Sequence, residues 1–235
     1  EECIGVIQLS AMDKRLDLKI SAIDEITELV ANLANHIKLV RRKLELESLR
    51  TEQDRQIDLI RRISRTIGLE ELLDILGEEI EWLAEFDGYL INLHDEEKQE
   101  LVCEKISLPE ACKAVEKTYQ GYTYTLDEND ANTVCFRNAE NVMIDRGSLG
   151  QCCERTRDRF ERWEMTHMVV LPIRSGRDEK RVLGTVMLFR QRDMINQDRL
   201  ERMEKLLIIF SEPIRNSLHY ERLHKKEQVL EKAGN

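Results

Sequence analysis

Cysteines are the residues of this chain best suited to covalent chemistry. The six are Cys3, Cys103, Cys112, Cys135, Cys152 and Cys153. No two have the CxxC spacing of a zinc or thioredoxin-type site, so we expect reduced thiols. The adjacent Cys152 and Cys153 raise a redox or metal hypothesis, although we favour a reading of them as buried or merely tolerated cysteines.

Two further short motifs suggest chemistry without completing a site. His94 and Asp95 form an HD dipeptide, but metal phosphohydrolases need more His and Asp ligands, so a turn is favoured. Arg155 and Asp158 have the RxxD spacing of inhibitory cyclic-di-GMP sites, and we favour a surface salt bridge for them. The sequence has no phosphate-binding GxxxxGK[ST] loop, HExxH motif or GxSxG motif. We therefore expect this chain to have no catalytic machinery of its own.

Aromatic and polar side chains between positions 120 and 170 predict a small-molecule site. Such sites combine apolar walls that bury the ligand with a few polar groups that orient it. Ordinary core packing is favoured for two of the aromatic residues, Phe160 and Trp163, whereas the tyrosines fit a ligand contact or a lid anchor equally well. The candidate ligand-binding residues are Tyr122, Tyr124, Cys135, Asp145, Phe160, Trp163 and His167.

Composition limits the classes of partner. The chain has 235 residues, enough for one ordinary domain with additional helices, and 35% of its residues are charged. Its net charge of −10 opposes the phosphate contacts that dominate nucleic-acid affinity, so direct DNA or RNA binding is not expected. No apolar run approaches the roughly 20 residues of a membrane-spanning helix, and no signal peptide is visible. We therefore expect a cytoplasmic chain without membrane insertion.

A long helix is predicted over residues 20–66, which contain no proline or glycine. Its apolar residues alternate spacings of three and four, which is typical of the seam of a coiled coil. The same register meets polar residues at Glu47, Thr51 and Asp54, so the seam loosens midway. A helix of this length needs a partner, most simply the same helix of a second chain, so we expect a homodimer. The predicted seam residues are Ile23, Ile26, Val30, Leu33, Ile37, Val40 and Leu44.

The remaining elements alternate between helices and strands. Strands are predicted at residues 89–94, 100–106, 141–144, 167–174 and 181–190. Helices are predicted at residues 69–85, 110–117, 132–138, 157–165 and 196–232. The stretch 120–131 is predicted to be an irregular loop or lid.

An internal similarity suggests how the chain is organised. Residues 4–9 (IGVIQL) and 183–188 (LGTVML) are each followed by a break and a charged helix. The similarity favours a repeat, with coincidence as the alternative. We thus interpret residues 1–19 as the remnant of an upstream domain, 20–66 as a signalling helix, 67–195 as a domain and 196–235 as an exit helix toward an output domain.

The order of these elements, with the phrases MVVLPI, RVLGTVMLF and CFRNAENVMIDR, resembles a GAF domain over about residues 57–220. The resemblance implies an α+β fold. It would have an antiparallel sheet of five or six strands, helices on both sides, and long flanking helices that couple to other domains. A ligand or protein site would lie between one face of the sheet and the lid helices.

The resemblance also implies a function. GAF domains are commonly sensory or regulatory modules, here of a bacterial-type signalling protein. Ligand or partner binding would be passed through dimeric helices to an output domain in cis, such as a diguanylate cyclase, a histidine kinase or an ATPase. The cofactor is not identified. Cys152 and Cys153 precede Glu154 rather than the histidine of bilin-binding members, and the NKFDE signature of cyclic-nucleotide-binding members is absent.

Two alternatives to a ligand sensor stay open. One is a ligand-free dimerisation spacer, whose pocket would be filled by its own side chains. The other is a free methionine sulfoxide reductase, an activity found in a small branch that resembles this fold. Its nucleophile and resolving thiol would come from Cys103, Cys135, Cys152 and Cys153 if these cysteines converge.

Overall fold

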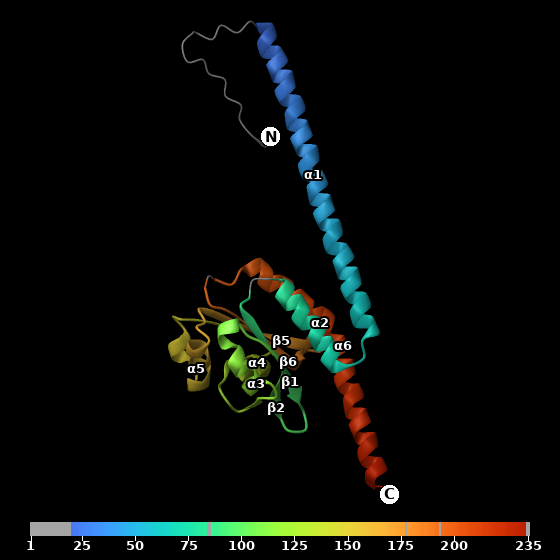
Figure 1. Ribbon diagram of the computed structural model, residues 1–235, viewed down its shortest axis with the longest axis vertical. Coiled ribbons are helices and arrows are strands. Elements are labelled where there is room, and N and C mark those ends of the chain that lie inside the picture. Colours follow the sequence, from blue (N-terminus) through green and yellow to red (C-terminus); the bar gives the residue numbers. More distant parts are fainter. Residues whose placement is uncertain (1–19, 84–85, 177, 193, 234–235) are drawn as a thin grey trace. The chain divides into compact units, whose positions relative to one another are not determined.

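The computed structural model describes residues 20–83, 86–176, 178–192 and 194–233 (Figure 1). The chain divides into two units, residues 1–59 and 60–235, which we describe separately. Residues 1–19, interpreted above as the remnant of an upstream domain, lie outside the described residues.

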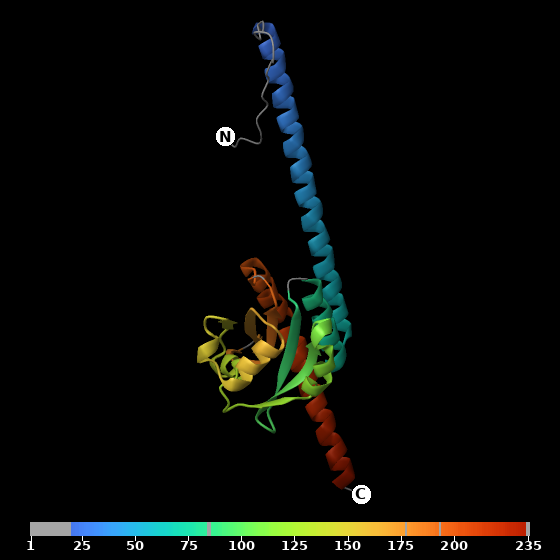
Figure 2. The same cartoon turned by 60° about the vertical axis from the view of Figure 1, so that its left-hand side comes forward.

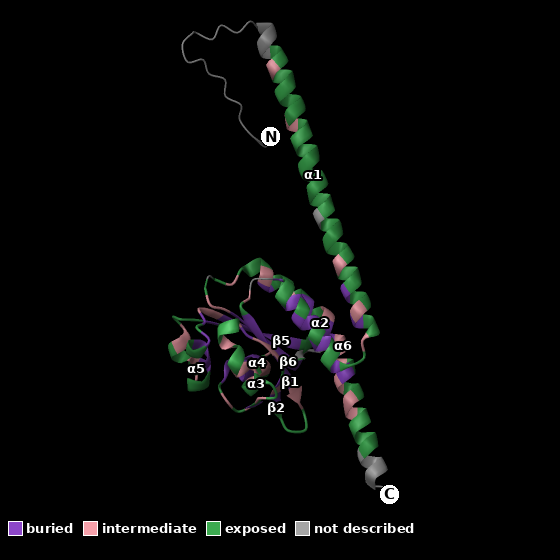
Figure 3. Ribbon diagram, viewed as in Figure 1, coloured by how far each residue is buried: buried purple, intermediate pink, exposed green. Residues whose placement is uncertain are grey.

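The first element is helix α1, Ile20–Arg65, with 46 residues and a length of about 69 Å at 1.5 Å per residue. Five predicted seam residues remain between 36% and 59% exposed, and the helix is coloured as exposed along most of its length (Figure 3). They are Val30, Leu33, Ile37, Val40 and Leu44. Ile26 is half-buried, and the side chain of Ile23 is not among those described. Pairing of this surface with a second chain stays a prediction.

The second unit is built around a six-stranded antiparallel sheet in the order β3-β2-β1-β6-β5-β4. The strands are β1 Gly88–Asp95, β2 Glu100–Ser107, β3 Thr123–Thr125, β4 Val142–Asp145, β5 His167–Ser175 and β6 Asp178–Arg190. The predicted α+β class and antiparallel sheet are confirmed. Strand β3 differs from the expected irregular loop, because Tyr124 is fully buried and its strand pairs with the start of β2.

Helices cover both faces of the sheet (Figure 1). They are α2 Leu69–Trp82, α3 Lys113–Tyr119, α4 Ala131–Asn138, α5 Glu154–Arg162 and α6 Gln197–Ala233. Helices α2 and α6 contact each other and pack on one face, whereas α4 packs on the other, where α3 and α5 add side chains to the same core. None of the described helices has the length and apolar character that crossing a membrane requires.

The alternation of side chains along the strands divides the core into two layers. In β5, Met168 and Val170 belong to the core on the α4 face. Their neighbour Leu171 points the other way and lines a cavity with Leu207 of α6. This strand is buried on both faces, which explains its nearly continuous apolar sequence.

A β-bulge in β2 directs neighbouring residues to opposite faces. Ile91 pairs with Lys105 but Asn92 pairs with Cys103, so Glu104 is the extra residue. Cys103 therefore lies in the core on the α4 face, while Lys105 forms an ion pair with Asp74 of α2. Without the bulge, residues 103 and 105 would lie on the same face.

Gly184 lies where strands β1 and β6 approach closely. It pairs with Leu93, and a Cβ atom at position 184 would lie 2.1 Å from the backbone oxygen of Asn92. No side chain fits at that distance. Close packing thus accounts for the glycine in the phrase RVLGTVMLF.

Helix α6 is tied to the segment between α1 and α2 by a partly buried hydrogen bond. The hydroxyl of Ser217, which is 4% exposed, donates a hydrogen bond to the backbone oxygen of Ile67 at 2.6 Å. Ile67 lies between the end of α1 at Arg65 and the start of α2 at Leu69. The contact fixes α6 to the connection through which the chain enters the domain.

Candidate functional site

The space between the sheet and residues 120–165, here called the lid site, is framed by the starts of two helices. Asp130 caps α4, and its carboxylate accepts a hydrogen bond from the backbone nitrogen of Asn132 at 3.0 Å. Cys153 caps α5, and its sulfur accepts one from the backbone nitrogen of Thr156 at 3.4 Å. Both helix starts thereby direct polar side chains into the same buried region.

A buried ion pair between Asp130 and Arg159 lies at the centre of the lid site. Their side chains are 0% and 1% exposed. The carboxylate also accepts hydrogen bonds from the Thr156 hydroxyl at 3.1 Å and from the Asn132 amide at 2.8 Å. Arg159 donates a further hydrogen bond to the Tyr124 hydroxyl at 2.8 Å. A buried charge pair is stable only with such additional hydrogen bonds.

The hydrogen bonds continue from the helices into the sheet. The amide nitrogen of Asn92 on β1 donates to the amide oxygen of Asn132 at 3.0 Å and to the Thr185 hydroxyl at 3.1 Å. Asn92 and Thr185 are direct neighbours in the β1–β6 register. We call the whole set the polar network: Asn92, Tyr124, Asp130, Asn132, Thr156, Arg159 and Thr185.

Electrostatics keep this ion pair charged. Burial opposes ionisation of Asp130, but the Arg159 charge and the hydrogen bonds from Asn132 and Thr156 hold the pKa of its carboxyl below the usual value. Burial also opposes the charge on Arg159, but Tyr124 and Asp130 raise the pKa of the guanidinium. Burial raises the pKa of Tyr124, so its hydroxyl stays neutral and accepts the hydrogen bond from Arg159.

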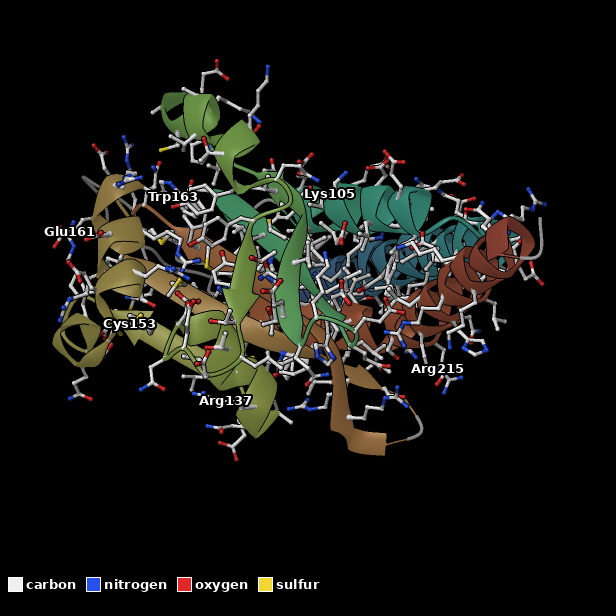
Figure 4. The ribbon with its side chains drawn as sticks, turned by 90° about the horizontal axis from the view of Figure 1, so that it is seen from below. Lys105, Arg137, Cys153, Glu161, Trp163 and Arg215 are labelled. Atoms are coloured by element: carbon white, nitrogen blue, oxygen red, sulfur yellow. The ribbon has the colours of Figure 1, made fainter. Side chains whose placement is uncertain are left out.

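A row of aromatic rings connects Tyr124 of the network to Trp163. Trp163 at the end of α5 (Figure 4) is fully buried and meets Tyr119 edge-on, with ring centroids 4.9 Å apart. Tyr122 is half-buried and lies 5.5 Å from Tyr119 and 5.0 Å from Tyr124, centroid to centroid. The guanidinium carbon of Arg155 lies 5.4 Å from the centroid of the Tyr122 ring. Tyr119 and Tyr122 are both partly exposed, so the row reaches the surface at its middle.

Five of the seven predicted ligand-binding residues lie in or beside the lid site. Cys135, Phe160 and Trp163 belong to its buried core, and Tyr122 packs against that core while partly exposed. Tyr124 is buried in the polar network. The interior is therefore filled by the protein's own side chains. Ligand binding by these residues stays a prediction.

The other two predicted residues lie apart, at the edge of the sheet. Asp145 at the end of β4 pairs in register with His167 at the start of β5. Asp145 is exposed, and its carboxylate accepts hydrogen bonds from the Ser148 backbone and hydroxyl, both at 2.8 Å. These bonds lower its pKa and close a turn. In this arrangement Asp145 stabilises the turn that follows β4.

Three buried polar atoms near the lid site have no hydrogen-bond partner among the described residues. They are Nε of Arg159, Nε1 of Trp163 and Oδ1 of Asn92. Buried polar groups are usually paired, so each marks a place that an ordered water or a polar ligand atom would satisfy. Two are donors, which favours a ligand that carries acceptor oxygens.

The cysteines of the lid site have the electrostatics of structural thiols. Burial raises the pKa of both the Cys103 and the Cys135 thiol to about 12, so neither is a thiolate at neutral pH. The Cys135 thiol donates to the backbone oxygen of Val170 at 3.5 Å. Burial also raises the thiol pKa of Cys152. The described residues contain no group of three or more His, Cys, Asp or Glu arranged to hold a metal ion.

The two residues of the RxxD spacing lie on the surface of α5. Arg155 pairs with Glu128, and Asp158 is exposed on α5. Arg155 thus forms a surface salt bridge, but with Glu128 rather than with Asp158.

Sequence reasoning did not single out the polar network. Its clearest signals were an asparagine within the apolar strand YLINLH and an aspartate directly before the helix ANTVCFRN. The first marks a buried amide that needs a partner, and the second is a typical N-cap. Neither signal shows that Arg159, on a strongly charged helix, turns inward to complete the network.

No protein-family model and no curated protein sequence matches this chain. Solved structures do match in shape. The domain superimposes on a GAF domain/HD domain protein from Geobacter sulfurreducens with a TM-score of 0.55 at 12% identity, over 66% of this chain and 97% of that one. This domain has the GAF fold. The GAF domain of a two-component sensor histidine kinase from Bacillus halodurans matches with a TM-score of 0.52 at 16% identity, over 66% and 99%.

A third match is a fragment of a methyl-accepting chemotaxis protein, with a TM-score of 0.54 at 18% identity, over 68% of this chain and 97% of that one. The two structures named as GAF domains are covered to 97% and 99%, so the chain contains a whole GAF fold. The resemblance drawn from MVVLPI and RVLGTVMLF is therefore confirmed at the level of the fold.

Proposed function

We propose that this chain is a sensory or regulatory GAF module that binds a small molecule at the lid site and passes its state through α1 and α6 to an output domain in cis. Proteins that share the fold include a two-component sensor kinase and a chemotaxis protein, which supports a role in signalling. The observation that carries the ligand proposal is the set of unpartnered buried atoms on Arg159, Trp163 and Asn92.

The geometry favours a small, flat ligand with acceptor oxygens. Tyr122 is partly exposed and lies between Tyr119 and Tyr124 in the aromatic row, so a ligand that displaces it would stack on Tyr119, whose ring contacts Trp163. Its oxygens would accept hydrogen bonds from Trp163 Nε1 and Arg159 Nε. Binding then requires residues 120–125 to move, which gives the ligand a way to change the domain.

The two tryptophans allow a direct test. Trp82 on α2 is 50% exposed and serves as the control for the buried Trp163. We expect hits from a metabolite library that raise Tm to lose the effect in Trp163→Phe and keep it in Trp82→Phe. The Trp82→Phe protein leaves Trp163 as the sole tryptophan, so a bound ligand will also change its emission.

A ligand-free spacer is the second candidate, favoured by one specific observation. Tyr124, Arg159 and Trp163 are at most 2% exposed and already fill the lid site. A library without hits, together with an unchanged Trp163 emission spectrum, would support this role over the sensor.

Dimerisation through α1 is part of the proposal. The predicted seam stays exposed in a single chain, and an apolar stripe of this kind is stabilised by pairing with an identical stripe. We expect the chain to have twice its monomer mass by light scattering, and Ile37→Glu to yield monomers. Asn35→Glu adds the same charge at an exposed position outside the seam and should remain dimeric. A monomeric wild-type chain would refute this part of the proposal.

A further inference from the structure

A second candidate site lies beside the C-terminal half of α6, away from the lid site. The turn of the β1–β2 hairpin lies next to this helix in both views (Figures 1 and 2). Between the turn, β6 and α6 is an open cavity of about 270 Å³ with an apolar part formed by Leu183 and Leu218. Its charged and titratable lining is Glu96, Arg181, Arg215, His219 and Arg222.

Basic residues reach this cavity from two elements. Arg215, His219 and Arg222 follow one another at intervals of four and three residues, so α6 presents them along one side (Figure 4 labels Arg215). Arg181 comes from β6. The sequence is acidic overall, with a net charge of −10, so a convergence of three arginines is a local exception.

One carboxylate of the chain already occupies the meeting point of two of these arginines. Oε1 of Glu96 accepts a hydrogen bond from Arg181 at 2.8 Å, and Oε2 accepts one from Arg222 at 2.6 Å. Burial opposes ionisation of Glu96, but its bond to Arg181 and the charge of Arg222 lower its pKa. The two guanidinium groups are therefore placed to hold the two oxygens of one anion.

Charge and exposure make Glu96 replaceable. Glu212 neutralises Arg215, which leaves Arg181 and Arg222 to share the single carboxylate of Glu96. The side chains of Glu96 and Arg181 are 40% and 56% exposed, and ion pairs as exposed as this contribute little to stability. An external anion with more charge can therefore compete for the same donors at small cost to the fold.

We propose that this cavity, the α6 anion site, binds a small metabolite through a phosphate or carboxylate group, with Glu96 as its internal competitor. The bound anion takes the place of the Glu96 carboxylate between Arg181 and Arg222, and Leu183 and Leu218 contact the ligand's carbon skeleton. The volume is below the roughly 300 to 1,000 Å³ of pockets for drug-sized ligands, which fits a small anion.

Binding there has a structural consequence. Glu96 is the group that joins the hairpin turn to α6 through Arg222, so an anion that replaces it releases the turn from the helix. The site thus acts on the helix that leaves the domain, and it does so independently of the lid site.

Calorimetry on the full chain tests the site with inorganic phosphate and citrate as probes, at constant ionic strength set with chloride. The loss of one charged donor in Arg222→Gln should weaken binding about tenfold. Glu96→Gln removes the competitor and should tighten binding about fivefold. Arg202→Gln is the matched control, because Arg202 is exposed on the same helix and does not line the cavity.

The outcomes separate cleanly. Tighter binding in Glu96→Gln with weaker binding in Arg222→Gln supports the site, and a preference for phosphate or for citrate identifies which anion it takes. Equal losses in Arg202→Gln and Arg222→Gln would show unspecific attraction and overturn the proposal. So would absence of binding by both probes in Glu96→Gln, a variant that keeps all three arginines and whose fold circular dichroism can verify.

Discussion

Removal of the Asp130 charge is the most direct test of the buried network. In Asp130→Asn the shape of the side chain is kept, but the fully buried Arg159 loses its counter-charge. Breaking a buried ion pair on one side costs about 3 to 5 kcal/mol. With an m-value of about 2 kcal/mol/M, the urea midpoint should fall by about 1.5 to 2.5 M. Asp127→Asn, the same change at an exposed site, should change the free energy of unfolding by less than about 0.5 kcal/mol.

The contribution of the Asp130 charge to stability should depend on pH in a predictable direction. The folded pKa of Asp130 is depressed, so its ionisation stabilises the fold above the unfolded carboxyl pKa of about 3.9. That contribution is lost as the pH falls through the lower folded pKa. The free energy of unfolding of wild type should therefore approach that of Asp130→Asn below about pH 4, and the two should differ most near neutral pH.

A double-mutant cycle decides whether the two charges act as a pair. Arg159→Met removes the unpaired charge that Asp130→Asn leaves behind. The double variant should therefore lose about 1 to 3 kcal/mol less stability than the two single variants lose in total. Additive losses, or a single-variant cost under about 1 kcal/mol with an unchanged m-value, would refute the reasoning.

Two further predictions concern packing and thiol chemistry. Gly184→Ala forces a Cβ against the Asn92 backbone and should lower the free energy of unfolding in urea by about 3 kcal/mol. Gly150→Ala is the control and should be nearly neutral, because no atom lies within 4 Å of the new Cβ. Equal losses in the two variants would contradict the close approach of β1 to Gly184. In the native protein at pH 8, Cys103 and Cys135 should react with iodoacetamide about a thousandfold more slowly than in urea, because burial raises both thiol pKa values to about 12. Mass spectrometry of the two cysteine-containing peptides measures the labelling. Rapid labelling of the native protein would instead favour the reductase hypothesis.

The elements of the fold were predictable where the pattern is local. Strand β5 is a continuous apolar run and β6 carries a glycine demanded by its neighbour, and both were expected close to where they lie. The helix α1 followed from an unbroken stretch without proline or glycine. Strand β3 was missed because three residues with two threonines and one tyrosine form a strand only when β2 offers a free edge.

The lid site was only partly predictable, since its parts are brought together by tertiary contacts. The aromatic residues were identified by their type. Asp145 is near them in the sequence, but the register of β4 with β5 places it apart from them, at the edge of the sheet. Arg159 was overlooked because its helix is strongly charged and reads as solvent-exposed. Its burial depends on Asp130, 29 positions earlier, which no local pattern connects to it.

The hydrogen bond from Ser217 to Ile67 has a mechanical consequence. Through this bond, a displacement of the connection before α2 would act directly on α6 and would not need to pass through the β-sheet. A ligand in the lid site, on the opposite face of the sheet, would then change how strongly this connection is coupled to α6 without forming part of the coupling contact.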